Sequence, residues 1–244
     1  MDQIDSSYLK NMVQGLFVTG TDTGIGKTVI AAGLVRLLSG QGRRALGLKP
    51  IASGADRTPA GLRNADALAL AAASAIEVPY AITNPYCFEP AIAPHLAAAE
   101  AGVPLTLPAL VRWYQEASAR AEIAIVEGAG GWRVPLHPDG FLSDLPERLG
   151  LGVLLVVGLR LGCLNHARLT LEAIERSGRC PFVGWIGCEI DPGLPRLDAN
   201  LDTLARLLGG PALAVVPHLA DPNPGRVAAH LEGPALACAL TAPA

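Results

Sequence analysis

The chain alternates between short, almost wholly apolar runs and longer segments with helical spacing. Residues 122–127 and 153–157 show the first pattern most clearly, with aliphatic side chains at nearly every position. Uninterrupted apolar runs of this length are typical of strands that are buried on both faces of a parallel sheet. We therefore expect strands at 15–19, 45–48, 122–127, 153–157, 182–187 and 213–216.

The segments between these runs repeat apolar residues every three or four positions, as amphipathic helices do. Residues 27–39, for example, follow this spacing and are stopped by Gly40. We expect helices at 27–39, 66–74, 107–121, 164–177 and 197–208. Strands that alternate with helices predict an α/β fold, in which a doubly wound, mainly parallel sheet is flanked by helices.

The domain organisation inferred from this pattern is simple. Residues 1–12 are polar and aperiodic and are predicted to form a flexible N-terminal extension. Residues 13–244 contain no internal repeat and no linker, so a single α/β domain is expected. Residues 79–108 are rich in Pro and Ala and poorly periodic, and we expect a long excursion over the surface there.

Composition narrows the class of protein further. Of 244 residues, 50% are hydrophobic and 17% charged, and the formal net charge of −3 comes without a basic stretch, which argues against nucleic acid as a partner. No apolar run approaches the roughly 20 residues needed to span a bilayer, and the first ten residues do not resemble a signal peptide. We expect a cytoplasmic protein without a membrane partner. The five cysteines lack C-x-x-C spacing, so we expect small buried residues rather than a zinc site or disulfides.

The segment 20–28, Gly-Thr-Asp-Thr-Gly-Ile-Gly-Lys-Thr, lies between the first predicted strand and the first predicted helix. In such a loop, backbone N–H groups and the helix N-terminus attract an anion. Lys27 would reach the β and γ phosphates, and the Thr28 hydroxyl could bind Mg²⁺. The loop is one residue longer than the common form, since its leading glycine is Gly20. The combination of strand, glycines and helix predicts a phosphate-binding loop of the P-loop NTPase type.

Two carboxylates are candidates to complete a magnesium site. Glu127 ends a predicted buried strand and is followed by Gly128-Ala129-Gly130-Gly131, at the sheet edge where ligands bind in open α/β folds. The alternative for Glu127 is an ordinary acidic exit from a strand. Asp66 lies at the start of a predicted helix, where a role in capping alone is the alternative. Mg²⁺ favours oxygen ligands of this kind.

A second lysine, Lys49, follows the second predicted strand in Lys-Pro-Ile-Ala-Ser-Gly. A lysine at this edge can stabilise the charge that develops during phosphoryl transfer. An ordinary surface lysine is the alternative. The residues alone thus predict a Mg²⁺-dependent nucleotide hydrolase with an extra cationic group, and they name no acceptor substrate.

Several segments taken together resemble the dethiobiotin synthetase family. They are 20–28, 49–54, the Leu-Arg-Asn-Ala-Asp-Ala-Leu of 62–68, the Asn-Pro-Tyr of 84–86, the Val-Glu-Gly-Ala-Gly-Gly-Trp of 126–132 and the Leu-Gly-Cys-Leu-Asn-His-Ala of 161–167. The resemblance runs in order from about residue 15 to 224. The loop alone would equally fit partitioning ATPases and amidotransferase-linked synthetases.

The resemblance implies a ligase that forms the ureido ring of dethiobiotin from 7,8-diaminopelargonic acid, CO₂ (or bicarbonate) and ATP. A substrate amine takes up CO₂ as a carbamate, ATP phosphorylates the carbamate, and the second amine closes the ring and releases phosphate. An anionic carbamate must then lie beside an anionic phosphate, which explains a need for nearby cations. The cofactor implied is Mg²⁺, with ATP as co-substrate.

The resemblance also assigns roles to residues. Thr28, Asp66 and Glu127 would bind Mg²⁺, and Thr23 and Ser53 would contact the substrate. Lys49 would be the catalytic lysine, with Lys27 as the second catalytic cation. Cys163 and Asn165 would receive the substrate carboxylate across the interface of a homodimer, at a helix N-terminus suited to an anion. The residues expected to hold the nucleotide are Gly24, Ile25, Gly26, Lys27, Thr28, Val29, Asp66, Glu127, Gly128, Ala129, Gly130, Cys188, Glu189, Pro217, His218 and Leu219.

Four residues, at three places in the chain, depart from the family's pattern. Cys188-Glu189 stands where the family commonly has Asn-Asp to read adenine, and a thiol is a poor replacement for an amide. A looser preference that admits other nucleoside triphosphates is therefore a hypothesis. His218 stands where a tryptophan is familiar, and Gly24 occupies a position where some relatives carry an acid.

Two rival functions stay open on the sequence. One is a nucleotide-switched ATPase of the partitioning kind, which acts through protein, DNA or membrane partners. Residues 231–244 contain no basic amphipathic helix, which argues against membrane attachment. The other is a related synthetase with a different substrate.

Overall fold

The computed structural model describes residues 14–137 and 140–241. Their central element is a six-stranded sheet. The predicted N-terminal extension, residues 1–12, lies outside the described residues. The strand order is β12-β11-β10-β1-β7-β2, and every neighbouring pair is parallel. The strands are β1 (Gln14–Gly20), β2 (Ala45–Leu48), β7 (Ile123–Glu127), β10 (Gly152–Leu159), β11 (Phe182–Glu189) and β12 (Ala214–Val216).

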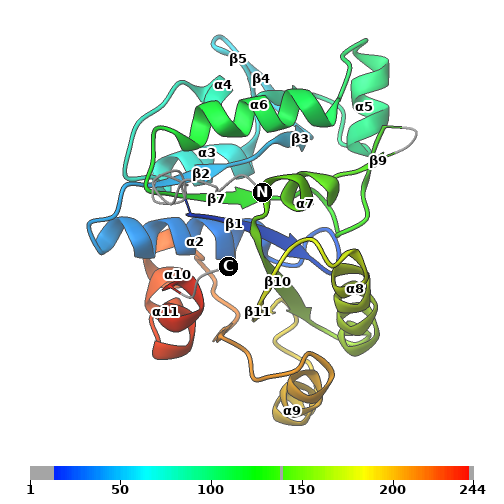
Figure 1. Ribbon diagram of the computed structural model, residues 1–244. Coiled ribbons are helices and arrows are strands. Elements are labelled where there is room, and N and C mark those ends of the chain that lie inside the picture. Colours follow the sequence, from blue (N-terminus) through cyan, green and yellow to red (C-terminus); the bar gives the residue numbers. More distant parts are fainter. Residues whose placement is uncertain (1–13, 138–139, 242–244) are drawn as a thin grey trace, which may run out of the picture.

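Helices cover both faces of this sheet, as Figure 1 shows. One face carries α2 (Lys27–Gly40), α3 (Ala65–Ala73), α10 (Pro224–Leu231) and α11 (Pro234–Thr241). The other carries α6 (Leu107–Ser118), α7 (Asp144–Leu149), α8 (Cys163–Ser177) and α9 (Leu197–Leu207). The doubly wound α/β fold predicted from the sequence is confirmed.

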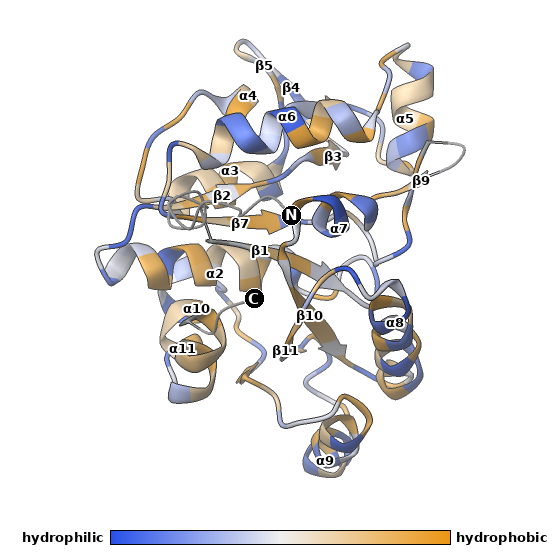
Figure 2. Ribbon diagram, in the orientation of Figure 1, coloured by the Kyte–Doolittle hydropathy of each residue, from blue (hydrophilic) through white to orange (hydrophobic). Residues whose placement is uncertain are grey.

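Alternation along the strands divides the core between the two faces. In β1, Leu16 and Val18 pack toward α2, while Phe17 packs toward α6. Both faces of β10 are buried throughout. Hydrophobic residues therefore run through the central strands and form one side of each surrounding helix, a distribution visible in Figure 2. This packing on two sides explains the uninterrupted apolar runs in the sequence.

The segment 79–108 differs from the prediction of an irregular excursion. It contains α4 (Tyr80–Thr83), β6 (Tyr86–Phe88) and α5 (Pro94–Glu100) and leads into α6. The strand β6 pairs in parallel with β3 (Ile51–Ser53), and Phe88 and Leu105 are buried in the core. Elements of three to seven residues are too short to show a period, so the pattern could not reveal them.

Two further short pairings and several helices were not predicted. The pairs are β4 (Asp56–Thr58) with β5 (Gly61–Arg63), and β8 (Pro135–His137) with β9 (Gly140–Phe141). The sequence pattern also missed α7, α10 and α11. Among the predicted elements, the 182–187 strand was too short, since β11 continues to Glu189.

The cysteines are less uniformly buried than expected. Cys163 and Cys188 are buried, whereas Cys87 and Cys180 are half-buried and Cys238 is exposed. The expectation of five buried thiols was therefore wrong for three positions. Within the described ranges, no helix is both long and apolar enough to cross a membrane.

Candidate active site

The phosphate loop connects the end of β1 to the start of α2. Its backbone requires glycine at Gly24 and Gly26, where φ is +72° and +91°, in a region that other residues rarely adopt. These glycines turn the chain so that α2 begins at Lys27, with its N-terminus facing the loop. The Lys27 Nζ donates to the carbonyl oxygen of Asp22 at 2.5 Å. The loop and helix together form a positive, N–H-rich concavity of the kind that binds phosphate.

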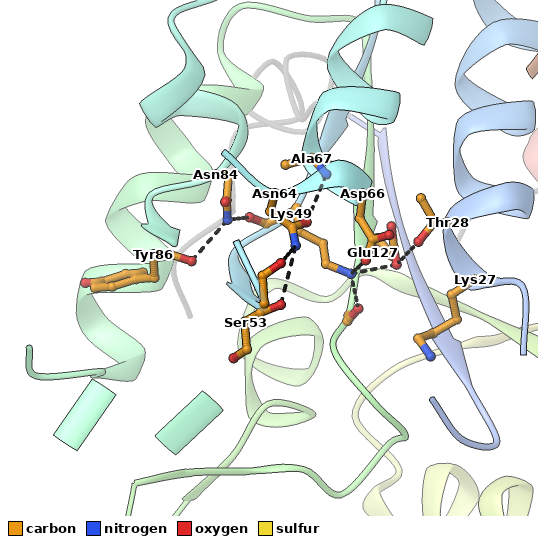
Figure 3. A network of polar contacts seen from close by, with 12 residues as sticks. Lys27, Thr28, Lys49, Ser53, Asn64, Asp66, Ala67, Asn84, Tyr86 and Glu127 are labelled. Atoms are coloured by element: carbon orange, nitrogen blue, oxygen red, sulfur yellow. Dashed lines mark hydrogen bonds and ion pairs between the residues drawn. The ribbon is translucent and has the colours of Figure 1, made fainter. Parts of the chain in front are cut away.

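Lys49 lies in a cluster with both predicted carboxylates. Its Nζ is 2.6 Å from Glu127 Oε1 and 3.1 Å from Asp66 Oδ2, and it also donates to the Gly128 carbonyl at 3.2 Å. The Thr28 hydroxyl donates to the same Glu127 oxygen at 2.8 Å. Figure 3 shows these side chains converging from separate elements beside Lys27. Residues 27, 28, 49, 66 and 127, far apart in sequence, thus meet at one edge of the sheet.

Burial and charge set the protonation of this cluster. Burial alone would lower the pKa of Lys49, but the charges of Glu127 and Asp66 outweigh it and raise that pKa above its usual value. For Asp66, burial alone would raise the pKa, yet the Lys49 charge holds it below the usual range. Burial and the neighbouring Lys49 lower the pKa of Lys27 to about 8. The shifts at Lys49 and Asp66 both favour the ionised forms, and the Lys49 ammonium is almost fully buried.

Two asparagines explain why the cluster is held in place. Asn64 caps α3, because its Oδ1 accepts the Ala67 N–H at 3.3 Å, and this cap places Asp66 in the first turn. Asn84 is buried and its amide donates to the Lys49 carbonyl at 2.7 Å. The segments 62–68 and 84–86 therefore contribute to the site through positioning as well as through contact.

A cavity of about 1020 Å³ opens between the phosphate loop, this cluster and the ends of β11 and β12. Most residues predicted to contact nucleotide or substrate line it. These are Thr23, Gly24, Gly26, Lys27, Thr28, Val29, Lys49, Ser53, Asp66, Glu127, Ala129, Gly130, Cys188, Glu189, Pro217, His218 and Leu219.

Four predicted residues do not line this cavity. Ile25 is 1% exposed and its side chain packs in the core under the loop. Gly128 contributes its carbonyl to Lys49 instead. Cys163 is buried at the first turn of α8, and Asn165 is on the same turn. A single chain therefore does not bring Cys163 and Asn165 together with Lys49 and Ser53.

The end of the cavity expected to receive the base is built by β11 and the loop after β12. Cys188 packs inward, and a Cβ at Gly26 would lie 2.4 Å from its Sγ, so the thiol sits against the phosphate loop. Burial raises the pKa of the Cys188 thiol to about 11, with Glu189 adding to the effect. Glu189 Oε2 accepts the His218 backbone N–H at 3.1 Å. Cys188 and Glu189 thus belong to the strand itself rather than to the loop after it.

Comparison with known proteins decides between the readings left open by the sequence. A family model described as an AAA domain matches residues 14–226. An ATP-dependent dethiobiotin synthetase of Pseudomonas paraeruginosa is 54% identical over 217 residues, which cover 88% of this chain and 95% of the relative. The corresponding protein of Cellvibrio japonicus is 46% identical and covers 90% and 96%. The chain belongs to the dethiobiotin synthetase family.

Solved structures show the same fold at much lower identity. A ParA family ATPase from Chlorobium tepidum superposes with a TM-score of 0.56 at 13% identity, and covers 95% of this chain and 100% of the other. The Pyrococcus furiosus cell division ATPase MinD gives 0.55 at 16%, with 94% and 96% covered. These likenesses establish the P-loop NTPase fold, and the dethiobiotin synthetase relatives establish the family.

Sequence reasoning missed several residues that line the cavity of this family member. Asn64 was noted only as part of the segment 62–68 that resembles the family. Its position directly before a helix nevertheless predicts an N-cap. Ala91, Ile92, Ala93 and Pro94 form an apolar wall, but they lie in the segment expected to be irregular. Val134 and Pro135 also carried no recognisable signal, since only the folded chain brings them to the cavity.

Proposed function

We infer that this chain is an ATP-dependent dethiobiotin synthetase, a ligase of biotin biosynthesis. The observation that carries this conclusion is the site itself: an intact phosphate loop joined in one cavity to Lys49, Asp66 and Glu127 in a member of that family. The partitioning-type ATPase is not favoured, because its representatives share the fold at only 13–16% identity.

We propose that the chemistry proceeds through a carbamate. One amine of 7,8-diaminopelargonic acid attacks CO₂ and loses a proton, forming the carbamate. A carbamate oxygen then attacks the γ-phosphorus of ATP, the bond to the bridging oxygen breaks, and ADP leaves. The second amine attacks the carbonyl carbon of this mixed anhydride and loses a proton, the bond from that carbon to the phosphate oxygen breaks, the ring closes, and phosphate departs. No side chain needs to act as a covalent nucleophile, so the protein positions and neutralises.

In this scheme Lys27 and Lys49 lower the repulsion between the carbamate and the γ-phosphate. Both ammonium groups line the cavity, and Lys49 is 4% exposed, so its charge acts with little screening by water. Lys27 belongs to the phosphate loop, and Lys49 reaches the same space from the end of β2. We propose that the two cations flank the transferred group.

Thr28, Asp66 and Glu127 are the residues proposed to hold Mg²⁺. The donor set suits a hard divalent cation, because it combines two carboxylates with a hydroxyl. Glu127 Oε2 is also buried without a hydrogen-bond partner among the described residues, which leaves it available to a ligand. When bound, Mg²⁺ would supply further positive charge to the phosphates.

Ser53 and Thr23 are proposed to contact the substrate, and the Ser53 hydroxyl is a buried atom at the cavity wall without a hydrogen-bond partner in the part of the chain that the structure describes. Cys163 and Asn165 lie outside this cavity, so we propose that they serve the neighbouring site of a homodimer. We also place the protein in the cytoplasm.

The direct test supplies purified protein with diaminopelargonate, bicarbonate and Mg-ATP and follows the ureido product by mass spectrometry. We expect product formed in a one-to-one ratio with ADP. Nucleotide hydrolysis without product, stimulated instead by lipid or DNA, would remove the ligase assignment in favour of the partitioning ATPase.

The base preference is a separate proposal within this function. The cavity wall at Cys188 offers only a weakly polar thiol, and one Glu189 oxygen is already engaged by the His218 N–H. We expect GTP and CTP to support turnover within about tenfold of ATP, a difference of about 1.4 kcal/mol, because this wall offers few polar contacts that distinguish one base from another. Strict dependence on ATP would reject the proposed loose base preference and would leave the ligase assignment unaffected.

A further inference from the structure

Asp22 places a negative charge in the loop that must bind a polyanion. Its carboxylate does not line the cavity, but its backbone carbonyl accepts the Lys27 ammonium at 2.5 Å. One carboxylate oxygen accepts the Thr23 N–H at 2.7 Å, and the other contacts Arg160. Both the main chain and the side chain of Asp22 therefore help to shape the phosphate loop.

Arg160 contacts the Asp22 carboxylate from the end of the neighbouring strand, β10. Its Nη2 lies 2.7 Å from Asp22 Oδ2. Arg160 follows directly after β10, which pairs in parallel with β1, so the ends of the two strands meet at this edge. The Arg160 carbonyl also accepts the Cys163 N–H at 3.1 Å, in the turn that starts α8. The ion pair thus ties the phosphate loop to the turn before α8.

The charge of Asp22 would oppose nucleotide binding if it were not balanced. A carboxylate close to the triphosphate repels it, and the repulsion grows with the charge of the ligand. The positive charge of the Arg160 guanidinium, 2.7 Å from this carboxylate, opposes that repulsion. Because the two side chains are 40% and 49% exposed, salt will weaken this balance, unlike the contacts of buried Lys49.

We propose that Arg160 is a positioning residue of the phosphate loop that acts through charge: it neutralises the carboxylate of Asp22, the residue whose carbonyl Lys27 contacts, and so removes a repulsive charge from the loop. This inference rests on nucleotide binding at the loop, as the proposed function does, but it does not depend on the acceptor substrate. Arg160 would then influence nucleotide binding although it does not line the cavity.

The test compares Arg160→Gln, Asp22→Asn and the double variant by calorimetric titration with Mg-ATP, Mg-ADP and AMP. We expect Arg160→Gln to weaken ATP binding about five- to tenfold, ADP less and AMP hardly at all, as a charge effect of an exposed pair requires. The double variant should return to within about twofold of the unaltered protein, because the uncompensated carboxylate is gone. The loss should shrink in 0.5 M salt.

A matched control is Arg120→Gln, which breaks a similarly exposed pair between Arg120, just after the end of α6, and Glu116 on that helix (47% and 62% exposed). If Arg160→Gln binds ATP as the control does, or if the double variant binds as weakly as the single one, the proposal is overturned. If Arg160→Gln folds poorly in thermal unfolding, Arg160→Lys replaces it in the titrations. Because lysine retains the positive charge, this variant must keep most of the affinity for ATP. Titration does not require ring closure, so a failed ligase assay would leave this result intact.

Discussion

Lys49 shows how single residues set the properties of this site. Its ammonium is almost fully buried and lies between Glu127, which is 1% exposed, and Asp66, which is 42% exposed. The pair with Glu127 is out of water, so neither charge can be removed alone without leaving the other uncompensated. The contact with Asp66 is partly exposed and contributes less. Lys49 therefore has a structural role in addition to its proposed catalytic one.

Replacing Lys49 with Gln separates these roles. We expect turnover to fall by at least ~10³-fold, because a preorganised cation beside the transferred phosphate is lost. We also expect a loss of about 3 kcal/mol in the free energy of unfolding, measured with urea, since Glu127 is left buried and unpaired.

The double variant Lys49→Gln/Glu127→Gln serves as the control. It should recover most of the stability, because no buried charge is left unpaired, while turnover stays lost. Near-normal turnover of Lys49→Gln would reject the catalytic role, and unchanged stability would reject the structural one.

At the scale of elements, the phosphate loop depends on its contact with β11. A Cβ at Gly26 would lie 2.4 Å from Cys188 Sγ, at a φ of +91°. A Cβ at Gly24 would meet open space, although φ is +72° there as well. The two glycines therefore share a backbone conformation but differ in what surrounds them.

Gly26→Ala is expected to weaken ATP binding on the order of 100-fold, because strain of about 1–3 kcal/mol adds to the collision with β11. Gly24→Ala, the matched control, should lose only about fivefold, through strain alone. Adding Cys188→Ala to Gly26→Ala removes the sulfur and should restore part of the affinity in a fluorescence titration. Equal losses at Gly24 and Gly26 would contradict a role for the contact with β11.

Some elements of this fold were predictable from the sequence and others were not. The predictions of a strand at 153–157 and a helix at 27–39 covered most of β10 and α2, because an uninterrupted apolar run and a helical spacing are both visible in adjacent residues. The pair β3–β6 was not, since each strand has three residues and their pairing joins positions far apart in the chain. Asn64 and Asn84, which position Asp66 and Lys49, likewise gain their roles only from partners that folding brings near.

At the scale of the whole molecule, the exposed apolar residues bear on the proposed homodimer. Leu161 is 91% exposed in the turn before α8, and Leu169 is 56% exposed on that helix. Both lie beside Cys163 and Asn165, which the cavity of one chain does not include. Apolar side chains exposed to this degree next to a proposed shared site suit a subunit contact.

Leu161→Glu is expected to shift the protein from dimer to monomer in light scattering, because a buried charge at the interface is costly. The KM for the diamine should rise together with this shift. Leu96→Glu on α5, where the leucine is 49% exposed, is the matched control and should leave the dimer intact. A monomeric unaltered protein would reject the shared site.

The sequence by itself determined the α/β fold, the phosphate loop and the family, because these depend on local periods and on motifs of adjacent residues. Only the tertiary structure decided how Lys49 is buried between Glu127 and Asp66, since burial and pairing are properties of the folded chain. The same holds for Cys188 against Gly26 and for Arg160 against Asp22, which are 162 and 138 positions apart and meet only because parallel strands end at one edge of the sheet.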